Sequence, residues 1–481
     1  MDRTITTLTL IMLSQILNSA EPLCLDTLPA HSTIGFLGDS ITQGVTLYFD
    51  KTGGRAWQDE MPRDHIEQSG LYHQIVQLFL ATRYPGKDLW TVNFGHAGGK
   101  ASDALRRLSF DVLPNLTDVM VIHFGMNDFG YLDYVHGKAS EASQARRMKS
   151  YQKNMIELVR RLQGKGCQVA IMSPTIYDEF VEKKVKPGKG AQAELAKYAA
   201  WCRELANAKE LAYVDLYTPM LLLTREQQRH SPKWSLTKDR IHPDNRRGGD
   251  EVMAYYLLEA FGASGVVYEV TLDATGRVLS SRNAEVDVHT NRDGLSFELV
   301  EHALPYPLLK TDQGFNQYVP FQSRLNRQIL CVKALPEGMY ELFIDKVSVG
   351  RYTAGDLARG VNLADNSRTP QYQTALGVRD LILFRKTVLE QRIRVIQNNL
   401  RFALKGEDGI DWDDPNSILA AMERVRKRSK VRGWKGYLFG VARYTLPRKQ
   451  QTYAELAGIR RRLAGMPRVY RHRYLLKRVS R

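Results

Sequence analysis

The stretch TIGFLGDSIT, residues 33–42, decides the fold. Its first five residues predict a short buried strand, and the turn Gly38-Asp39-Ser40 follows at the carboxyl end of that strand. In a sheet of the α/β type, a serine on such a turn stands where a nucleophile is exposed. The turn is not the G-x-S-x-G elbow of α/β-hydrolases, because Thr42 stands in place of the second glycine. Taken alone, a Gly-Asp-Ser turn is more often structural.

Short apolar runs alternate with helical patterns from residue 32 to residue 262. Such alternation implies right-handed crossovers and a parallel sheet with helices on both faces. A sheet of this kind binds ligands beyond the carboxyl ends of its strands. The predicted strands are residues 33–37, 89–94, 118–124, 168–172 and 211–215, and the predicted helices are residues 72–82, 101–108, 142–162, 192–206 and 250–261.

Three further polar segments fall at the same edge of the predicted sheet. NFGHAGG, residues 93–99, ends the second strand, and its glycines allow backbone N–H groups to approach a ligand. GMND, residues 125–128, ends the third strand and supplies a side-chain amide. DRIH, residues 239–242, follows the fifth strand. An Asp and a His three residues apart can bring the carboxylate to the near nitrogen of the imidazole, which leaves the far nitrogen for a serine hydroxyl.

Together the four segments resemble the four blocks of the SGNH (GDSL) hydrolase family. They occur in the order Ser, Gly, Asn and Asp/His, and the resemblance covers residues 32–262. It implies an α/β fold, a flavodoxin-like three-layer sandwich with a five-stranded parallel sheet. It also implies a serine hydrolase that acts on carboxylic ester bonds.

Carried over residue by residue, the resemblance implies a catalytic triad. Ser40 would be the nucleophile, and His242 the general base. Asp239 would orient His242 and stabilise its imidazolium form.

The resemblance also implies an oxyanion hole. Its donors would be the backbone N–H of Ser40, the backbone N–H of Gly98 and the side-chain amide of Asn127. In the family the block glycine stands five positions after the block asparagine, which selects Gly98 over the neighbouring glycines. Asp39 and Asp128 are interpreted as structural residues that hold turns.

Two histidines near these blocks do not predict a metal site. His123 lies within the third predicted strand and is interpreted as a hydrogen-bonded core residue. His96 lies in the oxyanion loop and is a candidate for substrate contact. The chain has no H-E-x-x-H pair, and none of its four cysteines forms a C-x-x-C motif. No metal and no organic cofactor is implied.

The pattern changes after Gly265. Strand-like runs and turn signals predict a β-rich accessory region over residues 266–365. IDKVSVGRYTA, residues 344–354, and GVNLA, residues 360–364, resemble extensions that follow SGNH domains in secreted bacterial proteins. Both a substrate-binding role and a structural role stay open for this region. Thr369-Pro370 is an N-cap and N1 signal that opens a helical segment over residues 369–423.

The charge of the chain is concentrated at its C-terminal end. Lys plus Arg number 68 and Asp plus Glu number 52, a net charge of +16. Residues 424–481 hold 19 Lys and Arg against one acid, Glu455, so this basic tail carries +18 and the rest of the chain −2. One interpretation is an anchor for an anionic polymer or surface, with nucleic acid an unlikely target for an exported protein. The other is a short helix that packs on the main body with flexible basic ends.

The N-terminus predicts export. Arg3 precedes an apolar run over residues 5–17, and Ala20 precedes Glu21, which is the order of regions in a secretory signal peptide over residues 1–20. The protein is then expected in the periplasm or outside the cell. The alternative is a first helix or strand of the fold. No later stretch approaches the ~20 apolar residues of a transmembrane helix.

These features predict a serine esterase that hydrolyses small acyl esters through an acyl-enzyme. Acetyl groups on carbohydrate are one candidate substrate, favoured by predicted export and by the β-rich region. An acyltransferase would use the same triad, and a binding protein with a vestigial site is the non-enzymatic alternative. The loop over residues 46–68, which contains Trp57, is expected to wall the pocket.

Overall fold

The computed structural model describes residues 23–44, 70–184, 186–244, 247–291, 294–385, 389–394, 398–431 and 433–479. The predicted signal peptide and the predicted pocket loop therefore lie outside the described residues.

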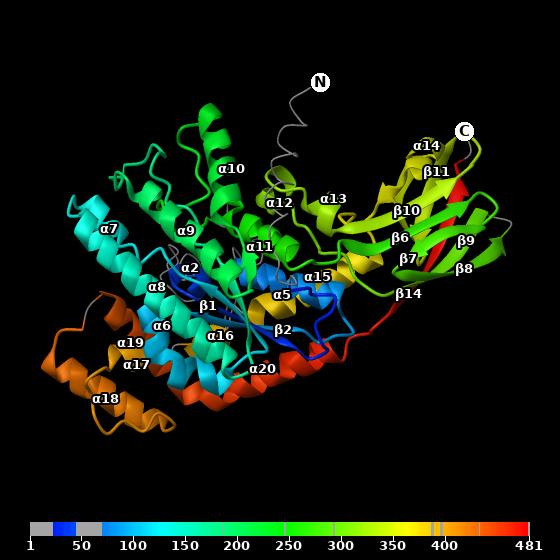
Figure 1. Cartoon of the computed structure of the whole chain (residues 1–481). Coiled ribbons are helices and arrows are strands. Elements are labelled where there is room, and N and C mark those ends of the chain that lie inside the picture. Colours follow the sequence, from blue (N-terminus) through cyan, green and yellow to red (C-terminus); the bar gives the residue numbers. More distant parts are fainter. Residues whose placement is uncertain are drawn as a thin grey trace.

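The first sheet is parallel throughout and has the strand order β2-β1-β3-β4-β5 (Figure 1). The chain adds β2 on one side of β1 and β3 on the other, so the carboxyl ends of β1, β2 and β3 lie side by side. The strands are β1 (Thr33–Gly38), β2 (Trp90–Gly95), β3 (Val119–His123), β4 (Gln168–Met172) and β5 (Ala212–Val214).

Helices pack against this sheet and against one another. Contacts pair α5 with α11, and α6 with α8, so two helical layers enclose the strands. In α8 the buried side chains Tyr151, Met155, Leu158 and Leu162 recur at helical spacing, which explains why this stretch is an amphipathic helix. The predicted α/β, flavodoxin-like fold is confirmed. The helices are α5 (Tyr72–Arg83), α6 (Ala101–Arg107), α8 (Glu141–Gln163), α9 (Ala191–Ala208), α10 (Tyr217–His230) and α11 (Gly249–Ala260).

Two further sheets form a β-rich module beside the first sheet (Figure 1). One has the order β13-β10-β6-β7 and the other the order β12-β11-β14-β9-β8. Their inner faces share one apolar core that includes Tyr268, Phe297, Leu330, Leu342 and Tyr474. The strands are β6 (Val266–Asp273), β7 (Val278–Arg282), β8 (Ala284–Asn291), β9 (Gly294–Glu301), β10 (Arg327–Lys333), β11 (Met339–Ile344), β12 (Val347–Thr353), β13 (Val361–Asn362) and β14 (Tyr470–Arg478).

The last strand comes from the basic tail. β14 lies between β11 and β9 and is antiparallel to both. The expected tail from Arg424 onward is thus divided between a helical part and the middle of a sheet. Figure 1 shows the chain running along α20 from the helical part to the β-rich module.

Helices after the β-rich region return to the first sheet. α15 packs on α5, and its N-cap is Thr369, whose Oγ1 accepts a hydrogen bond from the Tyr372 N–H at 3.3 Å. α17, α18 and α19 share a small core, here called the C-terminal bundle, that includes Leu400, Ile418, Met422 and Leu438. The helices are α15 (Pro370–Phe384), α16 (Glu390–Arg394), α17 (Leu400–Ala403), α18 (Pro415–Arg428), α19 (Gly433–Thr445) and α20 (Lys449–Ala464).

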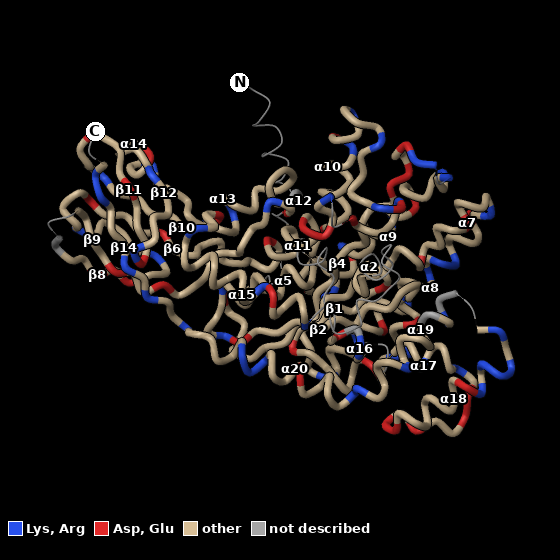
Figure 2. Tube along the Cα trace, turned by 180° about the vertical axis from the view of Figure 1, so that it is seen from behind, with Lys and Arg blue, Asp and Glu red and all other residues tan. Residues whose placement is uncertain are grey.

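Acidic residues just before the basic tail pair with part of its charge. Figure 2 shows acidic and basic stretches close together around α18. Glu407 accepts ion pairs from Arg424 and Arg428, and Glu423 accepts them from Arg426 and Arg443. The bundle is therefore closer to neutral than the tail alone, which lowers the field that it presents to solvent.

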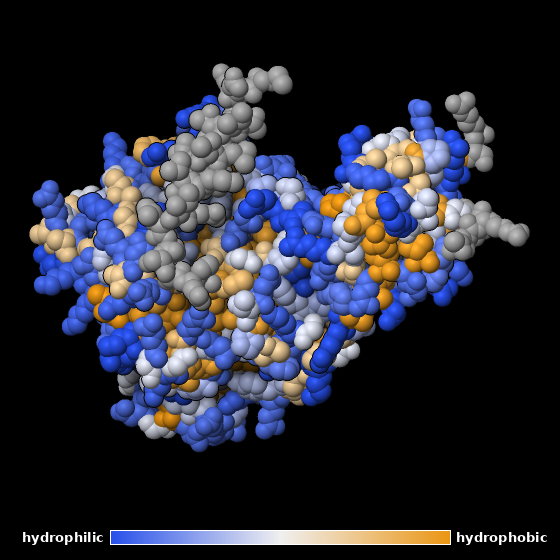
Figure 3. All heavy atoms as spheres, turned by 45° about the vertical axis from the view of Figure 1, so that its right-hand side comes forward, coloured by the Kyte–Doolittle hydropathy of each residue, from blue (hydrophilic) through white to orange (hydrophobic). Residues whose placement is uncertain are grey.

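Apolar residues reach the surface of the β-rich module (Figure 3). Its exposed apolar side chains include Val278, Leu279, Met339 and Val347. Among the described residues, no helix combines the length and the apolarity needed to cross a bilayer.

Candidate active site

Ser40 begins a one-turn helix, α2 (Ser40–Gln43), directly after β1. Asp39 caps this turn, because its Oδ1 accepts a hydrogen bond from the Ile41 N–H at 2.9 Å. Gly44 ends the turn in the left-handed conformation at φ 85°, which favours glycine. The turn therefore holds the Ser40 side chain, 9% exposed, at the carboxyl edge of the sheet.

His242 reaches Ser40 from the loop between α10 and α11. The Lys238 N–H donates to the His242 carbonyl at 2.8 Å, and Thr237 pairs with Pro243, which closes the loop on itself. Asp239 Oδ1 accepts the His242 N–H at 2.9 Å and the Ile241 N–H at 3.2 Å. The loop thus holds the Asp239 carboxylate next to His242, the residue that Asp239 would orient.

Two hydrogen bonds join the three residues of the predicted triad. Ser40 Oγ lies 2.8 Å from His242 Nε2, and His242 Nδ1 lies 2.7 Å from Asp239 Oδ2. With the carboxylate on Nδ1, the proton of the neutral ring belongs on that nitrogen and Nε2 is free to accept the Ser40 proton. The structure brings together in one chain residues that are 202 positions apart in the sequence.

The charges of this chain of hydrogen bonds support one another. Burial opposes ionisation of Asp239, yet the hydrogen bond and charge of His242 lower the Asp239 pKa to about 2. Burial alone would lower the pKa of His242, but the hydrogen bond and charge of Asp239 raise it above its ordinary value. The imidazolium form, which arises when the base takes a proton, is therefore stabilised.

Asn127 and Gly98 lie at the neighbouring strand ends. Asn127 follows β3, and its Nδ2 donates to Asp39 Oδ2 at 3.2 Å and to the Gly99 carbonyl at 3.1 Å. Gly98 is exposed and has a φ of 72°, in the left-handed region that glycine adopts without strain. Gly95, in contrast, packs where a Cβ would meet the backbone of Gln43. The three predicted oxyanion donors therefore sit on three adjacent loops.

Asp39 and Asp128 both hold turns at this edge. Asp128 accepts the Ala101 N–H at 3.0 Å and the Gly125 N–H at 3.2 Å, so it ties the Asn127 turn to α6. Burial raises the pKa of Asp39 to about 6 and that of Asp128 to about 7. Their hydrogen bonds agree with the structural interpretation.

His123 and His96 differ in their surroundings. His123 is buried, its Nδ1 lies 3.4 Å from Thr42 Oγ1, and burial lowers its pKa to about 3, so it stays neutral. His96 Nδ1 lies 3.1 Å from Asn398 Nδ2, far along the chain. Within the described residues, no group of three His, Cys, Asp or Glu side chains is placed to hold a metal ion.

Two arginines support the site without any sequence signal to mark them. Arg107 is buried, and its Nη2 donates to the Phe94 carbonyl at 2.6 Å and to the Gly38 carbonyl at 3.4 Å, at the ends of β2 and β1. Arg240, inside the DRIH block, has a φ of 78° and donates from Nη1 to the Asp178 and Glu179 carbonyls at 2.9 and 3.0 Å. Only the folded contacts reveal these roles.

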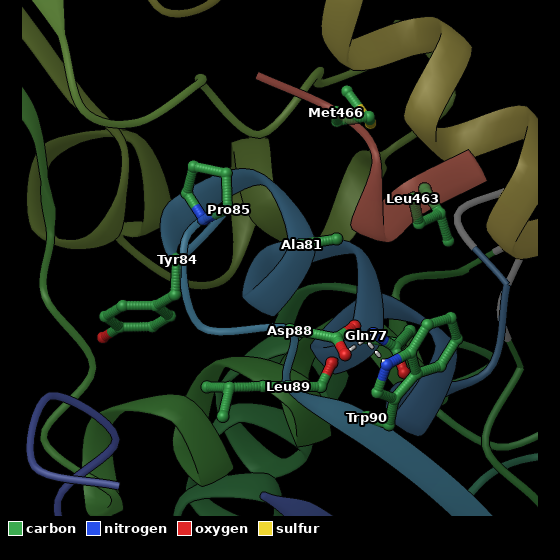
Figure 4. Close-up of a pocket in the computed structure, with 9 residues that line it drawn as sticks. All are labelled: Gln77, Ala81, Tyr84, Pro85, Asp88, Leu89, Trp90, Leu463 and Met466. Carbon is green, nitrogen blue, oxygen red and sulfur yellow. Dashed lines mark hydrogen bonds between the residues drawn. The ribbon is translucent and has the colours of Figure 1, made fainter. Parts of the chain in front are cut away.

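A separate small crevice lies between α5, the start of β2 and the end of α20 (Figure 4). Its polar lining includes Asp88, whose Oδ1 accepts the Trp90 Nε1–H at 2.5 Å. The described residues that line it include no serine, cysteine or histidine. It is lined by Gln77, Ala81, Tyr84, Pro85, Asp88, Leu89, Trp90, Leu463 and Met466.

Comparison with known proteins includes a match over nearly the whole chain. The gut microbial diltiazem-metabolizing enzyme BT4096 is 26% identical, with a TM-score of 0.76 over 94% of this chain and 98% of that chain. An acetylxylan esterase, Axe2 from Geobacillus stearothermophilus, is 21% identical over 49% of this chain and 95% of its own, with a TM-score of 0.35. LAE5, an alpha/beta hydrolase enzyme from the metagenome of Lake Arreo, Spain, is 22% identical over 49% of this chain and 97% of its own, also with a TM-score of 0.35. No curated protein matched the chain.

Residues 36–246 match the model of the GDSL-like Lipase/Acylhydrolase family. That range contains all four sequence blocks and the whole first sheet after the start of β1. The expected family resemblance is thereby confirmed. Residues 36–246 are a domain of the GDSL-like lipase/acylhydrolase family, and this domain makes the protein a carboxylic ester hydrolase of the SGNH type.

Proposed function

We propose that the protein is a serine esterase that hydrolyses small acyl esters, acetyl esters among them, through an acyl-enzyme. The observation that carries the proposal is the hydrogen-bonded chain Ser40–His242–Asp239, at 2.8 and 2.7 Å. A serine hydroxyl is a weak nucleophile unless a positioned base takes its proton, and this chain supplies such a base.

In the first step, Ser40 Oγ attacks the ester carbonyl while His242 Nε2 takes the hydroxyl proton. The C–O bond of the ester then breaks, and His242 returns the proton to the departing alcohol. Water repeats the sequence on the acyl-enzyme and releases the acid and free Ser40. Asp239 keeps the imidazole in the productive tautomer throughout.

The oxyanion that forms in each step would be bound by the backbone N–H groups of Ser40 and Gly98 and by the amide of Asn127. In the resting geometry the Asn127 amide donates to Asp39 and to the Gly99 carbonyl. Catalytic hydrogen bonds often tighten only when substrate is bound, so one of these protons would turn toward the oxyanion.

The alcohol portion of the substrate is part of the same proposal. The solved structure of BT4096, which matches this chain, is that of a diltiazem-metabolizing enzyme, and this makes diltiazem one candidate substrate. A carbohydrate acetyl ester remains the other candidate. A panel of aryl acetates, diltiazem and an acetylated xylo-oligosaccharide, assayed by liberated acetate, would rank these substrates.

Labelling with a fluorophosphonate tests the mechanism. The wild-type protein should be labelled at Ser40, and the Ser40→Ala and His242→Ala variants should not. A wild-type protein that is never labelled would support the vestigial-site alternative. Transfer of the acyl group to an added alcohol in preference to water would instead identify an acyltransferase.

Export and an anionic partner also remain proposals of ours. Export predicts a mature N-terminus near Glu21, which N-terminal sequencing of the protein from its native host would test. Lys427, Lys430, Arg461 and Arg462 are exposed on or near α18 and α20 and are the cations that would contact a polyanion. Substitution of all four by glutamate should weaken heparin binding, and added salt should weaken it further. Heparin binding that changes neither with salt nor with these substitutions would contradict the proposal of an anionic partner.

A further inference from the structure

The C-terminal bundle and Asn398, which lies just before α17, contact the oxyanion loop, residues 93–99, through His96. The His96 ring stacks on the ring of Phe402, with centroids 4.3 Å apart and planes 25° apart. Its Nδ1 lies 3.1 Å from Asn398 Nδ2, a contact between residues 302 positions apart. Both partners lie outside the hydrolase domain at residues 36–246.

His96 is the residue on which the turn that presents Gly98 depends. The His96 N–H donates to the Gly38 carbonyl at 2.9 Å, beside Ser40. The His96 carbonyl accepts the Gly99 N–H at 2.9 Å, which closes the turn around Gly98. A shift of His96 would therefore move the Gly98 N–H relative to Ser40.

The partners of His96 are themselves held in place. Asn398 is fully buried. Phe402 belongs to α17, whose neighbouring residues Leu400 and Ala403 are buried in the core of the C-terminal bundle. The same bundle reaches the hydrolase domain a second time, where the Arg401 guanidinium lies 5.1 Å from the centre of the Phe110 ring.

We propose that Asn398 and Phe402 are positioning residues that hold the oxyanion loop through His96, so that efficient ester hydrolysis requires the C-terminal bundle. The proposal rests on the proposed esterase function and deepens it. Each residue acts through its contact with His96. They act by restraining a turn whose N–H must point at the developing oxyanion, a requirement that tolerates little displacement.

Kinetics of Phe402→Ala and Asn398→Ala test the proposal. Each should lower kcat by about 10- to 100-fold, because a displaced Gly98 N–H no longer stabilises the oxyanion of the transition state. KM should change by less than about threefold, because the bound substrate does not use this hydrogen bond. Affinity for a trifluoromethyl ketone, which binds as a tetrahedral adduct, should fall by the same factor as kcat/KM. Phe402→Trp should keep most of the wild-type kcat that Phe402→Ala loses, because an indole ring can still stack on His96.

Phe110→Ala is the matched control. It removes one phenylalanine from the same contact between bundle and domain, but it leaves His96 untouched. Its kcat should stay near that of the wild type. Equal losses in Phe110→Ala and Phe402→Ala would overturn the proposal, because they would show that docking of the bundle, rather than His96, is what matters.

Two measurements distinguish the loss of the His96 contact from a general loss of protein stability. A double-mutant cycle between His96→Ala and Phe402→Ala should be strongly non-additive, with the double variant no slower than the slower single variant. Hydrogen–deuterium exchange over residues 94–100 should rise in Phe402→Ala and not in Phe110→Ala. Additive effects, or unchanged exchange in Phe402→Ala, would contradict the proposal.

The exchange measurement does not depend on ester hydrolysis. If the wild-type protein hydrolysed no ester and Ser40 were never labelled, the proposed function would fail. The restraint of the oxyanion loop by Phe402 would still be judged by the exchange data.

Discussion

Ser40 and Asn127 would serve one reaction in different ways, and two substitutions should separate their contributions. Ser40→Ala removes the nucleophile and should lower kcat by several orders of magnitude, since triad members act as a unit. Asn127→Ala removes one of three oxyanion donors and should cost less, about 10²–10³. Steady-state hydrolysis of an aryl acetate by variants with unchanged thermal unfolding measures both. A Ser40→Ala protein with wild-type rates would refute the assignment.

The pH dependence of the reaction should report the pair His242 and Asp239. The base works only when neutral, so kcat/KM should fall as pH falls through the pKa of His242. Asp239 raises that pKa above its ordinary 6.5, and the acidic limb should therefore have its midpoint above 6.5. In Asp239→Asn the stabilising charge is gone, and the midpoint should move to lower pH while the rate drops. A midpoint that does not move in this variant would argue against the pairing.

At the scale of the element, the loop that carries His242 depends on Arg240. This residue has a φ of 78° and its guanidinium is bound to two carbonyls. Both Arg240→Gly and Arg240→Ala lose those hydrogen bonds, but only alanine keeps the left-handed strain. Arg240→Gly should therefore have the larger free energy of unfolding, by roughly 1 kcal/mol. Urea titration of the pair tests this, and a more stable alanine variant would show that the loop relaxes to another conformation.

Most elements that carry the site could be predicted from local sequence, because the first three blocks each follow a short apolar strand. Ser40 and Asn127 each stand where a buried strand gives way to a polar turn, and a parallel sheet gathers such turns at one edge. The block that holds Asp239 differs, because α10 separates it from β5 and it was expected directly after that strand. The supports of the site could not be predicted in this way. Arg107 and Phe402 match no local pattern, and their roles arise from contacts across 13 and about 300 residues.

At the scale of the whole molecule, the β-rich module requires the end of the chain. Tyr474 and Leu476 of β14 are buried, 0% and 2% exposed, and the strand pairs on both sides. Deletion of residues 470–481 should leave β9 and β11 with unpaired edges and an open core, so the module should unfold or aggregate. Limited proteolysis should then cleave the region 266–365 while sparing the hydrolase domain. A resistant module in the deletion variant would show that the two sheets hold without β14.

In the basic tail, the charge count and the strand pattern predict different structures for the last residues. Counting charges from Arg424 onward marks the tail as one unit. A strand that pairs with partners more than 100 residues earlier has no local signal that names those partners. The spacing of the apolar residues Tyr470, Tyr474 and Leu476 is the local sequence feature that indicates a strand here.

The place of β14 also sets an order of events during synthesis. The hydrolase domain is complete once α11, which packs on α5 and ends at Ala260, has been made, so this domain can fold while much of the chain is still to be synthesised. β9 ends at Glu301, and its partner begins at Tyr470, about 170 residues later. At ~5–20 residues per second, β9 waits roughly 10–30 s with one edge bare. A nascent chain stalled in that interval would expose a strand edge that a chaperone, or another copy of the protein, could occupy.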